Sequence, residues 1–87
     1  MTLQMRRSAV SVSSNVAEGF GRQGYKEKVQ FYYLSRESLT ELENQFFIAR
    51  DISYINESES KKSIEQATVV HRLLQGLIKK SKSFLES

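Results

Sequence analysis

The 87-residue sequence predicts an all-α fold, an antiparallel up-and-down helical bundle with three helices in one domain covering residues 1–87. Three observations predict it. The chain has no proline, so no ring clash forces a helix to stop. Two clusters of glycine or polar residues, 19–24 and 53–58, divide the chain into three segments. In each segment the apolar residues recur with the helical period rather than the alternation of a strand.

The first predicted helix covers residues 2–19. Its apolar residues recur at spacings of four, three and four along one face, at Met5, Ala9, Val12 and Val16. Such a stripe is typical of a helix that turns one face toward a core. We expect Gly19 or Gly21 to form the C-cap, because glycine adopts the left-handed conformation at little cost.

The second predicted helix covers residues 25–53 and carries two adjacent stripes. One stripe comprises Phe31, Ser35, Ser38, Leu42, Ala49 and Ile52, and the other comprises Tyr32, Leu39 and Phe46. A helix that is apolar on two adjacent faces contacts more than one neighbour. We therefore expect this helix to pack against more than one element.

The third predicted helix covers residues 57–85 and has one broad stripe, formed by Ile64, Ala67, Val70, Leu74, Leu77, Ile78 and Leu85. Asn56, with Glu59 three residues later, fits an N-capping pair. Gly76 interrupts the helix at a cost of about 1 kcal/mol, for which a close backbone crossing is the natural explanation. His71 lies on the apolar face, where a core or interface role is favoured over metal binding.

Helices joined by short turns pack antiparallel, but helices this long in so short a chain enclose only a shallow core. We therefore expect a fourth helix from outside the chain, or self-association that leaves no stable monomer. Tyr33 and Phe47 lie near an otherwise polar line of the second helix and are candidates for the oligomer interface. The alternative is that they are ordinary scattered surface aromatics.

Composition excludes several classes of function. The absence of cysteine rules out disulfides, thiolate metal sites and a cysteine nucleophile. No apolar run approaches the length of a membrane span, and no signal peptide is recognisable. The literal G-x-G-x-x-G at 19–24 follows a helix rather than a strand, which favours a helix-to-helix turn over a nucleotide site. We expect a soluble cytoplasmic protein with no catalytic residues, metal or cofactor, and no membrane contact.

Three stretches of the sequence resemble motifs of a known family. Residues 4–22, QMRRSAVSVSSNVAEGFGR, are close to the pattern Q-x-R-R-A-x-x-S-I-x-S-N-I-A-E-G-x-G-R. Residues 38–43 resemble its G-S-L-x-E-L-E segment, and Tyr54 and Ile55 resemble its G-Y-I turn. On these motifs the chain resembles the 23S rRNA intervening sequence proteins.

The resemblance implies an up-and-down four-helix bundle that assembles into ring-shaped homo-oligomers, typically pentamers, without enzymatic activity. A related branch, the accessory protein of a reverse transcriptase in diversity-generating retroelements, binds nucleic acid and its enzyme partner. The family usually has a further helix before the block that contains Arg6 and Arg7. The sequence lacks this helix, so the chain is expected to be a shortened member or to start late.

Two groups of polar residues are candidates for specific roles. Asn15 and Glu18 are three residues apart, and we expect them to join a structural polar network that fixes the end of the first helix. Arg6 and Arg7 lie in the first turns of that helix, where the helix dipole disfavours cations. They are candidates for phosphate contact. The alternatives are a salt bridge to another chain, or a position inside a longer helix once the family's preceding segment is counted.

The charge pattern suggests the function. The chain has 13 Lys and Arg residues against 10 Asp and Glu residues, a net charge of +3. With antiparallel helices, both ends of the bundle are basic and its middle is acidic, and a ring would multiply this field. The candidate nucleic-acid-binding residues are Arg6, Arg7, Arg22, Lys26, Lys79, Lys80 and Lys82. For Lys79, Lys80 and Lys82 the alternative is that cations simply suit the C-terminus of a helix and keep it soluble. The first hypothesis is a non-enzymatic oligomer that binds RNA or DNA; the alternative is an oligomeric scaffold for a protein partner.

Overall fold

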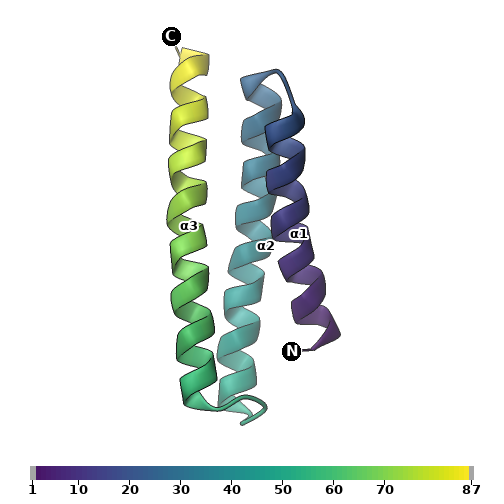
Figure 1. The fold of residues 1–87 in the computed structure, drawn as a ribbon, viewed down its shortest axis with the longest axis vertical. Coiled ribbons are helices and arrows are strands. Elements are labelled where there is room, and N and C mark those ends of the chain that lie inside the picture. The colour runs from purple at the N-terminus through teal and green to yellow at the C-terminus, as the bar shows by residue number, and fades with distance from the viewer. Residues whose placement is uncertain (1, 87) are drawn as a thin grey trace.

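The computed structural model describes residues 2–86, and these form three α-helices (Figure 1): α1 (Leu3–Gly21), α2 (Tyr25–Asp51) and α3 (Glu57–Glu86). The helices alternate in direction, and no strand is present among the described residues. The all-α prediction is confirmed, with the helix ends displaced by a residue or two. The molecule is elongated, with principal extents of 48 × 20 × 13 Å.

The helix starts follow the expected local chemistry. The Thr2 hydroxyl accepts a hydrogen bond of 3.1 Å from the Met5 N–H and so caps α1. Gly24 is the N-cap of α2 and supplies no side-chain bond. At the start of α3 the Asn56 side-chain oxygen accepts a hydrogen bond of 2.7 Å from the Glu59 N–H, which confirms the predicted capping residue.

The predicted glycine C-cap of α1 is wrong. Gly19 and Gly21 both lie inside the helix, and its C-cap is Arg22 in an extended conformation. Among the described residues no glycine has a positive φ, and the left-handed position belongs to Ser53, after α2, with φ of 60°. Gly19 is therefore required for a reason other than helix termination.

Helix α2 lies between the other two helices. Both α1 and α3 pack on it, and within residues 2–86 the backbones of α1 and α3 do not come close to each other (Figure 1). One core cluster comprises Val12, Tyr32, Leu39, Ala67, Leu74 and Ile78. The other comprises Met5, Leu42, Phe46 and Ala49. The second helix thus packs on two neighbours, as predicted, but its two stripes are not divided between them, since Tyr32 of one stripe and Ser35 of the other both contact α1.

A buried serine fixes the crossing of α1 and α2. Ser35 is fully buried, and its hydroxyl donates a hydrogen bond of 2.8 Å to the Val12 carbonyl oxygen of α1. A small side chain lets the helices approach closely, and the bond satisfies a hydroxyl that would otherwise be costly to bury.

Two residues of the predicted core are exposed. Ile52 is 70% exposed because α2 ends one residue earlier, so its side chain lies beyond the packed face. Leu85 is 49% exposed, since the contact in the last turn of α3 is made by Phe84, which stacks on Tyr25. The predicted stripes therefore hold within the helices and fail at their ends.

Gly19 is required by the packing of α1 on α2. A Cβ atom at this position would lie 2.5 Å from Cε1 of the Tyr32 ring. Tyr32 is only 2% exposed and belongs to the core cluster, so its ring has little freedom to move aside. Its burial also raises the pKa of its hydroxyl, which keeps the neutral form.

We predict that Gly19→Ala lowers the free energy of unfolding by about 1–3 kcal/mol, because it overpacks a closed contact. Gly21→Ala is the matched control, since a Cβ there would meet no atom within 4 Å. Urea unfolding followed by circular dichroism measures both. A Gly19→Ala protein as stable as the Gly21→Ala protein would contradict the packing role.

Candidate functional site

The bundle has two basic ends, which antiparallel packing assembles from different helices (Figure 1). The lysine end combines the last turns of α1 and α3 with the first turns of α2. Its cations are Arg22, Lys26, Lys28, Lys79, Lys80 and Lys82. The arginine end lies at the opposite pole, with Arg6, Arg7, Arg50, Lys61 and Lys62 as its cations. The predicted binding residues therefore form two separate surfaces.

Several cations of the lysine end already have partners within the chain. Arg22 lies 3.1 Å from the Glu18 carboxylate and 3.8 Å from that of Glu27, and it stacks over the Phe31 ring. The Lys82 ammonium lies 5.3 Å from the centre of the Tyr33 ring. These two cations are less available to an external phosphate.

Lys28 has a structural role that the sequence did not indicate. Its ammonium donates hydrogen bonds to the carbonyl oxygens of Gly19, at 3.0 Å, and of Phe20, at 3.2 Å. These carbonyls belong to the last turn of α1, where intrahelical donors run out. The contact ties the end of α1 to the start of α2.

Lys26, Lys79 and Lys80 are exposed, and no ion pair joins any of them to another described residue. Neither Lys79 nor Lys80 has an acidic residue three or four positions away on α3. By contrast, Lys61 at the arginine end lies one turn from both Glu57 and Glu65. Along α3, acidic neighbours therefore neutralise Lys79 and Lys80 less than they neutralise Lys61.

The two residues predicted to form one polar network have separate partners. The Asn15 amide donates to the Ser11 carbonyl oxygen at 2.8 Å and lies 3.2 Å from the Ser11 hydroxyl. That hydroxyl is 2.7 Å from the hydroxyl of Ser38, which links α1 to α2. Glu18 instead pairs with Arg22 at the surface, where such a bridge is worth little.

The aromatic candidates for an interface lie under cations. Tyr33 is partly buried, with Arg36 at 4.8 Å and Lys82 at 5.3 Å from its ring centre. Phe47 is 39% exposed and lies under Arg50. Both belong to α2 and stay accessible in part.

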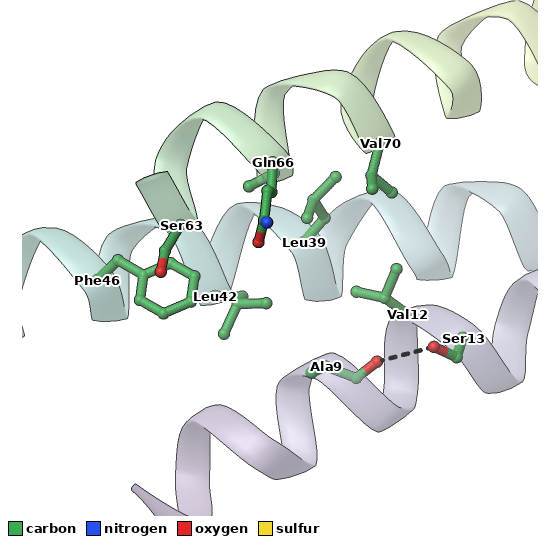
Figure 2. A pocket seen from close by; sticks show the side chains of 10 residues that line it. Ala9, Val12, Ser13, Leu39, Leu42, Phe46, Ser63, Gln66 and Val70 are labelled. Carbon is green, nitrogen blue, oxygen red and sulfur yellow. Dashed lines mark hydrogen bonds between the residues drawn. The ribbon is translucent and has the colours of Figure 1, made fainter. Parts of the chain in front are cut away.

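A groove separates α1 from α3 above α2, and we call it the α1/α3 groove. Its walls are Ala9, Val12, Val16 and Phe20 of α1 and Val70, Leu73 and Leu77 of α3, with Leu39, Leu42 and Phe46 of α2 at its floor. Figure 2 shows side chains from all three helices converging on this hollow, with Ser13, Ser63 and Gln66 beside them. Leu73 is 64% exposed and Phe20 is 60% exposed, so the groove leaves large apolar side chains uncovered.

Gly76 lines the same groove. A Cβ there would meet no atom within 4 Å, so the expected backbone crossing is absent from the described part of the chain.

His71 lies at the other edge of α3, where its Nδ1 is 3.1 Å from a Glu43 carboxylate oxygen. No cluster of three or more potential metal ligands occurs among residues 2–86.

The resemblance of residues 4–22 to a family motif can be compared with a profile of the whole family. The sequence profile of the 23S rRNA-intervening sequence proteins matches residues 1–76. The chain belongs to the 23S rRNA-intervening sequence protein family. This confirms the resemblance drawn from residues 4–22, and the family is not known as an enzyme family. Neither curated proteins nor solved structures give a match to the chain.

No helix within residues 2–86 has the length and hydropathy needed to cross a membrane.

We predict that Lys28→Gln lowers the free energy of unfolding by about 1 kcal/mol, because two carbonyl oxygens lose a charged donor. Lys26→Gln, two residues earlier and without an ion pair among the described residues, should change it by less than about 0.5 kcal/mol. Thermal melts of both variants at equal concentration test this. Equal losses would mean that the Lys28 contact contributes nothing specific.

Proposed function

We propose that this protein is a non-enzymatic, oligomeric helical bundle of the cytoplasm that binds nucleic acid, and RNA in particular, through its basic ends. The observation that carries the proposal is the group of three exposed lysines at the lysine end, Lys26, Lys79 and Lys80, which have no ion pair within residues 2–86. The name of the family, which refers to ribosomal RNA, supports RNA as the ligand.

Binding of this kind rests on phosphate contacts. Each lysine that neutralises a phosphate releases condensed counterions, so affinity falls as salt rises. A surface of lysines without planar, bidentate groups positions the backbone but reads little sequence. In an oligomer the same end recurs once per subunit, and the repeated positive charge attracts a polyanion more strongly than one subunit does.

The predicted binding residues have unequal parts in this proposal. Lys26, Lys79 and Lys80 make the principal phosphate contacts. Arg22 and Lys82 support them from positions already held by Glu18 and Tyr33. Arg6 and Arg7 act at the arginine end, on a separate stretch of the ligand or on a second ligand.

We predict that replacing Lys79 and Lys80 together by Gln weakens RNA binding and makes its salt dependence shallower by about one unit of slope per lost contact. The matched control is Lys61→Gln with Lys62→Gln, which removes the same charge from the opposite end of α3. Fluorescence anisotropy with a labelled RNA at about 50 and 200 mM salt measures both.

The control variant should weaken binding less than the Lys79 and Lys80 variant does, because Lys61 lies one helical turn from both Glu57 and Glu65. Equal weakening by the two double variants would show that only net charge matters and would overturn the assignment to the lysine end. An oligomer that binds no RNA at low salt would exclude nucleic acid and favour the scaffold function.

Self-association through the α1/α3 groove is the second part of the proposal, and it also underlies the alternative scaffold function. A monomeric protein of 10.0 kDa exposes about 5,200 Å² of surface, whereas this chain exposes 6080 Å². The excess of about 900 Å² is close to the ~800 Å² that each partner buries in an interface of standard size.

A second copy can supply the helix that covers the groove. Leu34 and Ile48 are 47% and 60% exposed on α2, and Glu41 lies between them on the same face. This face is apolar and acidic, and the groove is apolar with the cation Arg72 among its lining residues. Placing α2 of one copy in the groove of the next is a head-to-tail contact, which closes into a ring when the rotation permits. A pentamer, as the resemblance implied, is one such ring.

We predict that Gly76→Ala weakens self-association by about tenfold, because the added methyl group intrudes on the helix in the groove. Within one chain the same change should favour α3 by about 1 kcal/mol, since the position is open. Gln75→Ala, on the neighbouring exposed position, is the control. Sedimentation velocity over a dilution series gives the dissociation constants, and equal constants for the two variants would contradict the groove as the interface.

A further inference from the structure

The lysine end carries an aromatic feature that phosphate binding alone does not use. Tyr25, the first residue of α2, and Phe84, in the last turn of α3, stack with ring centres 4.6 Å apart and an angle of 16° between the planes. The two residues are 59 positions apart in the sequence, and antiparallel packing brings them together.

This pair differs from the aromatic contact of the core. Phe20 meets Tyr32 edge to face at 6.0 Å, and Tyr32 is only 2% exposed. Tyr25 and Phe84 are 39% and 48% exposed, so their stack lies at the surface. Rings stacked in parallel at a surface offer a flat outer face to a further ring.

Positive charge adjoins the stack on both helices. Lys26 follows Tyr25 directly, and Lys80 precedes Phe84 by four residues, which places it one turn away on the same side of α3. Both belong to the three lysines without an ion pair among the described residues. A flat aromatic face beside lysines is the arrangement by which proteins hold single-stranded nucleic acid, with bases on the rings and phosphates on the cations.

We propose that the Tyr25–Phe84 stack binds an unpaired nucleobase, so that the ligand of the lysine end is single-stranded RNA rather than a duplex. This inference rests on the proposed function. In a duplex the base faces are already covered by their neighbours, and only unpaired bases in loops, bulges or ends can stack on protein rings. Because every base has such a face, the site distinguishes single-stranded from double-stranded RNA but does not distinguish one base sequence from another.

The test compares two RNA probes, a single strand of about 12 nucleotides and a duplex of the same sequence. Phe84→Leu removes the ring and keeps an apolar side chain, whereas Phe84→Tyr keeps the ring. We expect Phe84→Leu to weaken single-strand binding by about tenfold and to leave duplex binding within about twofold. Phe84→Tyr should bind both probes as the wild type does. Circular dichroism melts of both variants establish that the end of α3 stays folded.

The outcomes separate this inference from the proposed function. If Phe84→Leu weakens neither probe while the Lys79 and Lys80 double variant weakens both, phosphate binding stands and the base-stacking site is overturned. Equal weakening of both probes by Phe84→Leu overturns it as well, since strand selectivity is then lost. If the wild-type protein binds neither probe at low salt, the proposed function itself fails.

Discussion

The contact of α2 with both neighbours is the constraint on which the rest of the structure depends. Within residues 2–86 only α2 brings its backbone close to the other two helices, so the close helix-to-helix packing runs through α2. The close approach of α1 rests on two positions without bulk, Gly19 against Tyr32 and Ser35 against the Val12 carbonyl. Because α1 and α3 lie side by side on α2 with their backbones apart, their apolar faces border a groove that stays uncovered. The groove, the elongated shape and the separation of the two basic ends all follow from this arrangement.

The helices could be predicted from the sequence because periodicity is a local signal. The N-cap at Asn56 was predictable for the same reason, since its bond to Glu59 spans only three residues. The role of Gly19 was not, because the atom that requires it belongs to Tyr32 on another helix. Ile52 shows the same limit: the pattern continues the stripe by one residue, whereas the helix ends at Asp51 and removes the residue from the packed face.

The basic ends were also predictable only in part from the sequence. That the ends are basic follows from sequence and antiparallel order alone. Which cations are already engaged depends on side-chain geometry that no spacing reveals, as with Lys28 on the carbonyls of α1. Arg22 with Glu18 was foreseeable, since the two are one helical turn apart. The Tyr25–Phe84 stack was missed, although the predicted helix directions place the start of the second helix beside the end of the third.

The most direct measurement is the mass of the protein in solution, by light scattering coupled to gel filtration, down to the lowest concentration that can be detected. If a second copy covers the α1/α3 groove, the mass is a multiple of 10.0 kDa, and the helical signal falls together with the mass on dilution. A monodisperse species of 10.0 kDa that still melts cooperatively would contradict this, because it would mean that α1, α2 and α3 are stable together with the groove open.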